Sequence, residues 1–166
     1  PIRLRIAISG CTYMCNSPLL HDIGVIGRIR PLRTPGLCTG CGTCAEYCKK
    51  CAIVLKNGVS VLEEGKCVQC GICIHSCPYH LLKSEYDHYQ IMVGGRRGDA
   101  PRIGRELVTV ETEEEVVEVI DRIVYWIYRS AWSDRRLADQ MDEIGYEKFA
   151  EGIRKEFGPD RQVAGE

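Results

Sequence analysis

Eight of the eleven cysteines in this chain fall into two copies of one spacing, and that spacing belongs to iron–sulfur chemistry. The first copy is Cys38-x2-Cys41-x2-Cys44-x3-Cys48, and the second is Cys67-x2-Cys70-x2-Cys73-x3-Cys77. The three closely spaced thiolates of each run can hold one face of an iron–sulfur cube. The repeated run therefore predicts two [4Fe–4S] clusters and a chain that carries electrons.

In two-cluster ferredoxins, the fourth cysteine of each run binds the other cluster. The sequence thus predicts a crosswise arrangement of ligands. The first cluster is expected on Cys38, Cys41, Cys44 and Cys77, and the second on Cys67, Cys70, Cys73 and Cys48. The first run departs from the usual pattern at Lys49, which stands where the second run has Pro78. This departure leaves the number of ligands unchanged.

Two other uses of many cysteines fit less well. A disulfide framework is typical of small secreted chains, and no apolar signal segment is visible. Zinc sites usually combine two separated C-x2-C pairs, or cysteines with histidines. So many thiols instead indicate a reducing interior, so we expect a cytoplasmic protein of an anaerobe.

Size and charge narrow the function further. The 166 residues can form one ordinary domain or two small ones. The formal net charge of −1 gives no electrostatic case for nucleic-acid binding. No stretch approaches the ~20 uncharged apolar residues of a membrane-spanning helix, so no membrane span is expected.

Outside the cysteine-rich segment, the sequence predicts a mixed α+β domain. Strands are expected at 2–9, 22–30, 88–93 and 106–110, with Pro31 and Pro35-Gly36 as boundaries. Shorter helices are expected at 134–143 and 146–156. We therefore expect residues 1–33 and 86–166 to form one domain, interrupted by a ferredoxin-like insert at 34–85.

A long helix is predicted to begin after Thr112, because Thr112 and Glu115 form a capping box. Its apolar residues recur at helical spacing and indicate one buried face. They are Val116, Val119, Ile120, Ile123, Val124 and Ile127.

The insert contains an internal repeat, CTGCGTCAEYCKKCAI against CVQCGICIHSCPYHLL. Each half is expected to form a cluster loop, a short helix and a strand. Between the halves, AIVLKNGVSVL predicts a β-hairpin with Asn57-Gly58 as its two-residue turn. Cys51 belongs to neither ligand set; it is either a spare ligand or a small buried residue.

A second constellation, Cys11-x3-Cys15, is a weak motif alone, because two thiolates cannot complete a cluster. Its surroundings, ISGCTYMCNSPLLHDIGVIGR, resemble the second half of the cluster motif of sirohaem-dependent sulfite and nitrite reductases. In that family a C-x3-C motif follows a strand ending in glycine and precedes an Asp-x-Gly strand, here Asp22-Ile23-Gly24. The stretch YQIMVGGRRGDAPRIGREL resembles the family's strand and Gly-rich loop after the cluster. The inserted two-cluster ferredoxin is similar to dissimilatory and anaerobic-type sulfite reductases.

The resemblance implies that Cys11 and Cys15 are two ligands of a third [4Fe–4S] cluster, and that Cys15 bridges to the sirohaem iron. A thiolate there raises the electron density on the iron. The resemblance also places Arg96, Arg97 and Arg102 near the carboxylates of the macrocycle, since guanidinium groups pair with carboxylates in bidentate fashion. The alternative is that these arginines belong to a solvated loop.

The resemblance covers only the C-terminal part of the family pattern. In the family, a C-x5-C motif supplies the other two ligands of this cluster. Outside the two cysteine runs no C-x5-C occurs, so two ligands of the third cluster are missing from this chain. The N-terminal half, whose basic residues line the substrate face in the family, is also absent. These parts lie upstream of Pro1, come from a partner chain, or have been lost.

The leading hypothesis is a part of a sirohaem sulfite or nitrite reductase in which two ferredoxin clusters pass electrons to a sirohaem-coupled [4Fe–4S] site. The family chemistry is the six-electron reduction of sulfite or nitrite, and the ferredoxin insert favours sulfite. Its partners would be an electron-donor protein or a reductase subunit. The alternatives are a non-enzymatic ferredoxin-type electron-transfer subunit and an isolated fragment without sirohaem.

Overall fold

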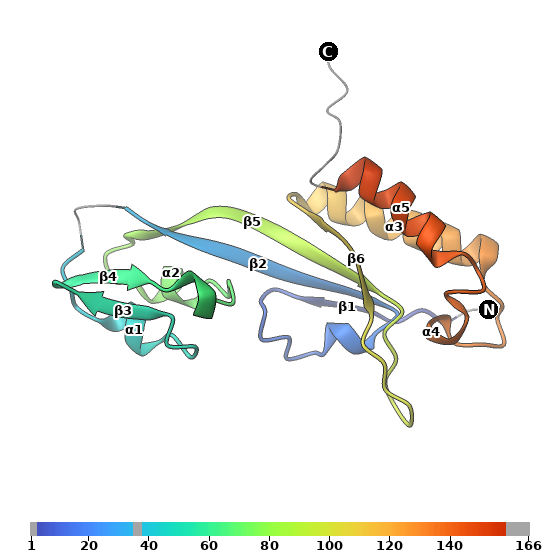
Figure 1. The fold of residues 1–166 in the computed structure, drawn as a ribbon, viewed down its shortest axis with the longest axis horizontal. Helices are drawn as coiled ribbons and strands as arrows, with labels where there is room; N and C mark the ends of the chain where they lie inside the picture. The colour runs from blue at the N-terminus through green and yellow to red at the C-terminus, as the bar shows by residue number, and fades with distance from the viewer. Residues whose placement is uncertain (1–2, 35–37, 159–166) are drawn as a thin grey trace, which may run out of the picture. The chain divides into compact units, whose positions relative to one another are not determined.

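A computed structural model describes residues 3–34 and 38–158 (Figure 1). By its internal contacts the chain divides into two compact units. Unit 1 takes the described residues within 1–10, 14–27 and 88–166, and unit 2 takes those within 11–13 and 28–87. The chain passes from unit 1 to unit 2 inside strand β2 (Ile23–Arg33) and returns to unit 1 inside strand β5 (Leu82–Val93). The sequence predicted these two boundaries at 33/34 and 85/86.

Unit 1 is a mixed α+β structure, so the fold class predicted from the sequence is confirmed. Strand β1 (Ile6–Ser9) pairs in parallel with β2, with Ile6 opposite Ile23. Strand β5 pairs antiparallel with β6 (Arg105–Val110), with Tyr89 opposite Val110. The order in the sheet is β1-β2-β5-β6. The short 3-10 helix η1 (Pro18–Leu20) lies in the loop between β1 and β2.

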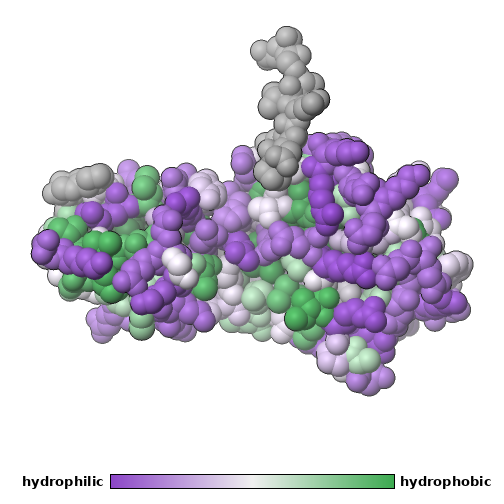
Figure 2. Space-filling view, viewed as in Figure 1, coloured by the Kyte–Doolittle hydropathy of each residue, from purple (hydrophilic) through white to green (hydrophobic). Residues whose placement is uncertain are grey.

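Three helices follow the sheet in unit 1. They are α3 (Glu113–Ser130), α4 (Leu137–Gln140) and α5 (Tyr146–Phe157). Helices α3 and α5 lie side by side (Figure 1), and Trp126 of α3 stacks on Phe149 of α5 with ring centroids 4.6 Å apart. Figure 2 shows mainly hydrophilic residues over these helices on the face in view. The helices therefore cover an apolar core with a polar surface.

The capping box before α3 is confirmed, since the Glu115 amide donates to the Thr112 hydroxyl and the Glu115 carboxylate accepts from the Thr112 amide. The buried face is narrower than predicted, because Val124 is partly exposed. The core of unit 1 joins this face to the sheet, α4 and α5. Its buried members are Ile23, Val25, Ile91, Val93, Leu107, Val108, Val110, Val116, Val119, Ile123, Ile127, Leu137, Met141, Tyr146, Ala150, Ile153 and Phe157.

Unit 2 contains short elements: α1 (Thr43–Glu46), β3 (Ile53–Lys56), β4 (Val59–Leu62), the 3-10 helix η2 (Glu64–Lys66) and α2 (Ile72–Ser76). The predicted hairpin is confirmed, because β3 pairs antiparallel with β4. Both turn residues, Asn57 and Gly58, have positive φ, as this turn requires. The buried core cluster of unit 2 is small and consists of Cys44, Ile53, Cys73, Cys77 and Leu82.

Several predicted element bounds are wrong. Strand β2 runs through Pro31 to Arg33, since the fixed φ of proline is compatible with extended backbone. Strand β5 begins at Leu82 and is therefore longer than the strand predicted at 88–93. The prediction missed the first half of the strand, because that half is exposed and polar and lacks the alternation of apolar and polar residues. The helix predicted at 134–143 is reduced to α4. The predicted boundary at Pro35-Gly36 and the start of the strand at Ile2 lie outside the described residues. No helix in the described part of the chain is long and apolar enough to cross a membrane.

Candidate functional site

The first candidate site is a cavity in unit 2 that four cysteines line. These are Cys38, Cys41, Cys44 and Cys77. The Ser60 amide donates to Cys38 Sγ at 3.5 Å, and its hydrogen bonding, together with that of the Gly40 amide, lowers the pKa of Cys38. The Thr43 side chain contacts Cys41 and likewise lowers the pKa of that thiol. Local hydrogen bonds therefore favour the thiolate form of Cys38 and Cys41, whereas burial raises the pKa of Cys44 in the same cavity.

The second candidate site is another cavity in unit 2. Its cysteines are Cys48, Cys67, Cys70 and Cys73. The Ala52 amide donates to Cys48 Sγ at 3.3 Å, and the Gln69 amide donates to Cys67 Sγ at 3.4 Å. Burial, followed by the charges of the neighbouring cysteines, raises the pKa of Cys73 to about 11. The side chain of Tyr13 also lines this cavity.

The two cavities are related by the internal repeat, which the backbone preserves at an offset of 29 residues. Left-handed residues recur at Gly40 and Gln69, and at Gly42 and Gly71 just before α1 and α2. Amide-to-sulfur hydrogen bonds recur too. The Leu81 amide donates to Cys77 Sγ at 3.4 Å, as the Ala52 amide does to Cys48. Each half of the repeat therefore supplies amide donors to thiolates.

The donor sets of both cavities fit a [4Fe–4S] cluster, because four sulfurs surround each hollow and backbone amides point at them. Within the described ranges, no three Cys, His, Asp or Glu side chains gather closely enough to hold a single metal ion. The hydroxyl of Tyr13 is buried beside the second cavity, and its interaction with the Cys70 thiol falls short of an ordinary hydrogen bond. Sulfur acceptors in that cavity would give it one.

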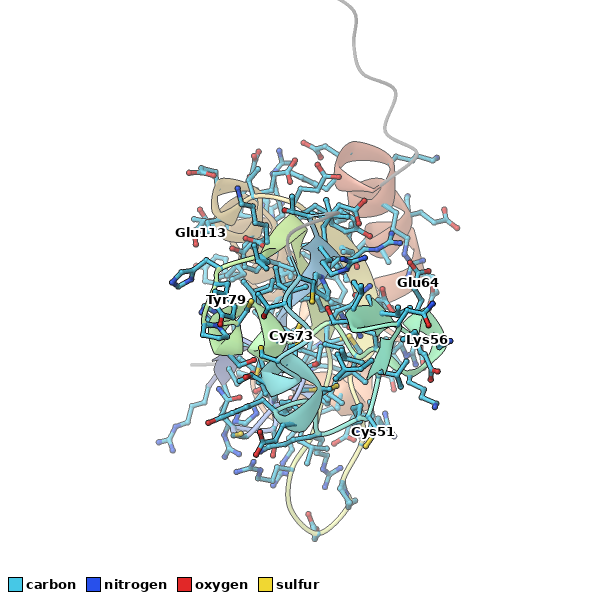
Figure 3. The ribbon with its side chains drawn as sticks, turned by 90° about the vertical axis from the view of Figure 1, so that its left-hand side faces the viewer. Cys51, Lys56, Glu64, Cys73, Tyr79 and Glu113 are labelled. Atoms are coloured by element: carbon cyan, nitrogen blue, oxygen red, sulfur yellow. The ribbon has the colours of Figure 1, made fainter. Side chains whose placement is uncertain are left out.

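Cys51 lies in neither cavity. It is exposed, and Figure 3 shows its sulfur at the periphery, whereas Cys73 lies further inside. The interpretation of Cys51 as a small buried residue is therefore wrong. Cys51 has a left-handed backbone with φ of 49°, which turns the chain after Cys48 in the same way as His80 does after Cys77.

The loop that carries Cys15 packs closely on the strands of unit 1. A Cβ at Gly24 would lie 2.3 Å from the Pro18 carbonyl oxygen, and one at Gly95 would lie 2.4 Å from the Leu19 oxygen. The Gly104 amide also donates to the Leu19 oxygen at 2.8 Å. Gly24 of the Asp-x-Gly motif and Gly95 of the Gly-Gly motif are thus explained by this close approach. Cys15 itself is exposed, while Cys11 is half-buried and belongs to unit 2.

The three arginines expected near the macrocycle differ in their surroundings. Arg96 Nη1 donates to both carboxylate oxygens of Asp139 at 2.9 Å, and Arg96 Nη2 donates to Asp99. Arg102 donates to the Ala138 carbonyl oxygen. Both contacts fasten the Gly-rich loop to α4. Among the described residues, the Arg97 guanidinium has no hydrogen-bond or ion-pair partner.

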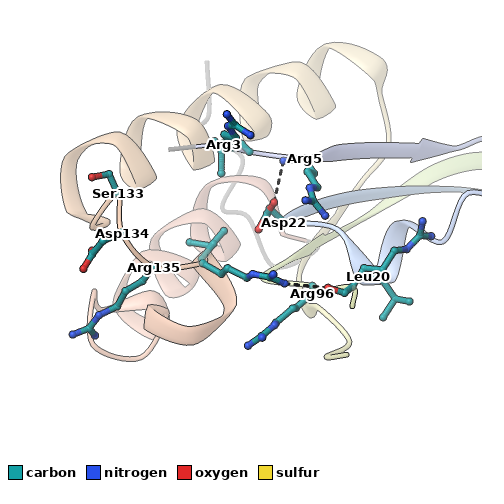
Figure 4. Close-up of a pocket in the computed structure, with 13 residues that line it drawn as sticks. Arg3, Arg5, Leu20, Asp22, Arg96, Ser133, Asp134 and Arg135 are labelled. Atoms are coloured by element: carbon teal, nitrogen blue, oxygen red, sulfur yellow. Dashed lines mark hydrogen bonds between the residues drawn. The ribbon is translucent and has the colours of Figure 1, made fainter. Parts of the chain in front are cut away.

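Arg96 and Arg97 line an open pocket in unit 1 (Figure 4), and Arg102 does not. Four further arginines lie around this pocket: Arg3, Arg5, Arg135 and Arg136. Two carboxylates, Asp22 and Asp134, offset part of their charge. Burial raises the pKa of Asp22, which accepts a hydrogen bond from the Arg5 amide at 3.0 Å. The pocket is thus predominantly cationic and suits an anionic group.

Residues 1–160 match the family model of the nitrite and sulphite reductase 4Fe-4S domain. The chain belongs to this family. It is therefore an iron–sulfur protein related to sulfite reductases. The sequence predicted iron–sulfur chemistry at the two cysteine runs and at the Cys11-x3-Cys15 motif. In the structure the two runs line the two cavities, and the loop after Cys15 packs on the strands of unit 1.

Two curated relatives define the neighbourhood of the chain within the family. The coenzyme F420-dependent sulfite reductase of Methanocaldococcus jannaschii is 36% identical over 157 residues, which are 93% of this chain and 25% of that protein. One of the subunits of the anaerobic sulfite reductase of Salmonella typhimurium is 30% identical over 175 residues, which are 99% of this chain and 52% of the relative. This chain thus spans a quarter to about half of the length of these relatives.

The fold is also that of a solved sulfite reductase. The crystal structure of dissimilatory sulfite reductase I matches 98% of this chain and 45% of that chain, with a TM-score of 0.62 and 20% sequence identity. At this level of identity the likeness concerns the fold. The mixed sheet and helices described above therefore belong to a known sulfite reductase architecture.

Sequence reasoning missed two residues at the cavities. Tyr13 lies between Cys11 and Cys15 in the sequence, but its side chain lines a cavity formed by cysteines more than 30 positions away. Ser60 lies in the hairpin and donates to Cys38. No spacing rule signals either contact, because both arise when segments distant in sequence come together.

Proposed function

We propose that this chain is the iron–sulfur portion of a sirohaem sulfite reductase and that it conducts electrons through two [4Fe–4S] clusters toward a sirohaem-coupled site. The observation that carries the proposal is the composition of the two cavities. Each contains three cysteines of one run and the last cysteine of the other run. This is the crosswise ligand set expected of two-cluster ferredoxins.

The protein's own residues would hold and tune the clusters. The first cavity would bind one cluster through Cys38, Cys41, Cys44 and Cys77, and the second would bind another through Cys48, Cys67, Cys70 and Cys73. When bound, the clusters supply one-electron transfer, and sirohaem supplies the site where a sulfur or nitrogen oxyanion is reduced. The amides of Ser60, Ala52, Gln69 and Leu81 would donate to thiolate sulfurs and stabilise the added electron.

Cys11 and Cys15 would contribute two ligands to the sirohaem-coupled cluster, with Cys15 as the bridging sulfur. The remaining ligands and the substrate-binding face would come from another segment or a partner protein. Of the three arginines, Arg97 is best placed to meet a macrocycle carboxylate, because Arg96 and Arg102 already bind α4. The eleven thiols without disulfides support a reducing compartment such as the cytoplasm.

The proposal is tested by preparing the chain without oxygen, alone and with its neighbouring reductase segment or subunit. The chain alone should bind about eight irons, because each of the two clusters uses four thiolates. The assembled protein should bind more iron and show the absorption spectrum of sirohaem. A chain that holds less than one cluster's iron contradicts the proposal.

The second candidate function is a ferredoxin-type electron-transfer subunit without sirohaem. It is favoured by the engagement of Arg96 with Asp139 and of Arg102 with Ala138, which leaves fewer guanidinium groups for a macrocycle. This function predicts about eight irons and no sirohaem absorption, even in the assembled protein.

A further inference from the structure

Tyr13 connects the Cys11-x3-Cys15 motif to one of the two cavities. It lies between the two motif cysteines, and its side chain lines the second cavity together with Cys48, Cys67, Cys70 and Cys73. No residue from 11 to 15 lines the first cavity in the described part of the chain. The two cavities, although related by the repeat, therefore differ in their relation to this motif.

The Tyr13 hydroxyl faces the cavity without a conventional partner. Its oxygen is buried and forms no hydrogen bond of normal geometry with any described residue. Burial and, after it, the charge and the side-chain contact of Cys70 raise the pKa of Tyr13. A buried hydroxyl without a partner is costly, so a sulfur acceptor in this cavity would remove that cost.

Lys49 holds the ring of Tyr13 from one side. Its ammonium lies 5.3 Å from the ring centroid, which is within the range of a cation–π interaction. Lys49 follows Cys48 directly, at the position where the second run has Pro78. The departure of the first run from the usual ferredoxin pattern thus has a structural counterpart: a proline could not make this contact.

We propose that Tyr13 is a positioning residue that donates its hydroxyl proton in a hydrogen bond to a sulfur of the cluster in the second cavity, and that this cluster is the exit point toward Cys11, which belongs to the same unit. The inference rests on the proposed function and extends it to the order of the clusters. Hydrogen bonds to sulfur stabilise the reduced state and raise the reduction potential. Tyr13 therefore makes the cluster in the second cavity a stronger electron acceptor than the cluster in the first cavity.

The electron balance is simple. A reduced electron-donor protein gives up one electron, which reaches the cluster in the second cavity. That cluster is then oxidised by one electron when the acceptor bound by Cys11 is reduced by one. Tyr13 is neither oxidised nor reduced, and its proton stays on its own oxygen.

The test uses the full chain with both clusters loaded, in the Tyr13→Phe variant. A redox titration followed by electron paramagnetic resonance measures the potential of each cluster without turnover. We expect one cluster to shift to a more negative potential, while the other keeps its potential and the iron content is unchanged. Tyr128→Phe is the matched control, because Tyr128 is exposed on α3 and lines neither of these cavities, and it should shift neither cluster.

A second variant and a second measurement test the inference even if the Tyr13→Phe variant binds its clusters incompletely. Lys49→Gln keeps the hydroxyl and removes the cation, and it should shift the same cluster in the same direction by less. In the wild-type chain, electron–nuclear double resonance in deuterated water should find an exchangeable proton coupled to one cluster. Fully loaded protein with no shift in Tyr13→Phe, or without such a proton, overturns this inference. Protein that binds no iron contradicts the proposed function instead.

Discussion

The two units are built from different kinds of core. Among the described residues, the buried core cluster of unit 1 has seventeen members, and nearly all of them are aliphatic or aromatic. The buried core cluster of unit 2 has five members, of which three are the cysteines Cys44, Cys73 and Cys77. Apolar burial stabilises by about 25 cal/mol per Å². Unit 1 therefore has the means to fold by itself, whereas unit 2 lacks enough apolar surface.

The difference shows how a small unit can be stabilised by what it binds. Small domains bury too little apolar surface and often depend on metals or disulfides. In unit 2 the cysteines occupy the positions that leucine or isoleucine would fill in an ordinary core. On the proposed assignment, iron–sulfur bonds replace hydrophobic contacts there. Ligand sets of this kind become ordered when the metal binds.

The comparison is tested most strongly by removing the iron. Chelation of the loaded chain should unfold unit 2 and leave unit 1 folded, because only the core of unit 2 consists of ligands. Hydrogen exchange measured by mass spectrometry should show complete loss of protection in 38–82 and retained protection in α3. Loss of protection in both units, or in neither, would contradict the proposed difference between the cores.

The free energy of unfolding of unit 1 should depend on the packing of its apolar core and not on iron. Ile123→Ala removes a fully buried side chain from α3 and should lower the free energy of unfolding of unit 1 by about 2–5 kcal/mol. Urea denaturation of the chelated chain measures this loss. Val124→Ala, one position along the same helix and partly exposed, should change it by less than about 0.5 kcal/mol. Both variants should retain the iron of the wild-type chain.

The capping box of α3 should give a smaller effect. Thr112→Ala removes the hydroxyl that accepts from the Glu115 amide at 3.2 Å. The free energy of unfolding of unit 1 should fall by about 1 kcal/mol, again measured by urea denaturation. Glu114→Gln in the same turn makes no cap contact and should have a weaker effect. Equal losses in the two variants would show that the cap is not the cause.

The smallest effect concerns alkaline pH. Burial raises the pKa of Tyr146 to about 12, and its hydroxyl has no hydrogen-bond partner in the described residues. Between the ordinary pKa of about 10 and the folded value, the unfolded state releases a proton that the folded state keeps, so stability falls as pH rises. Tyr146→Phe should flatten this fall and change stability at pH 7 by less than about 1 kcal/mol. Denaturation at pH 9 and 11 measures both. If Tyr146→Phe leaves the fall of stability with pH unchanged, another titrating group causes that fall.

Local signals in the sequence predicted much of this structure. The repeated cysteine run, the Asn57-Gly58 turn and the capping box at Thr112 act over a few residues, so their geometry follows from spacing. The family resemblance rested on similarly local motifs, such as Asp22-Ile23-Gly24. These are the parts of the fold and of the candidate site that a single sequence could reveal.

The features that the sequence could not reveal depend on contacts between distant segments. Val124 was predicted to lie on the buried face of α3, yet it is partly exposed, because helical spacing does not say where the contact with the rest of the unit ends. The resemblance placed Arg96 near a macrocycle carboxylate, and no spacing rule indicated that Asp139, 43 positions away, accepts a hydrogen bond from it. Nothing in the sequence around Tyr13 indicated that this residue lines the second cavity. Periodicity indicates which faces an element has, while tertiary packing decides what each face meets.

The central claim is that the last cysteine of each run belongs to the opposite cavity. It is tested most directly by alkylating the loaded Cys77→Ala chain without oxygen and mapping the modified thiols by mass spectrometry. The account predicts modification of Cys38, Cys41 and Cys44, with Cys48, Cys67, Cys70 and Cys73 protected. Modification of Cys67, Cys70 and Cys73, with the first run protected, would contradict it.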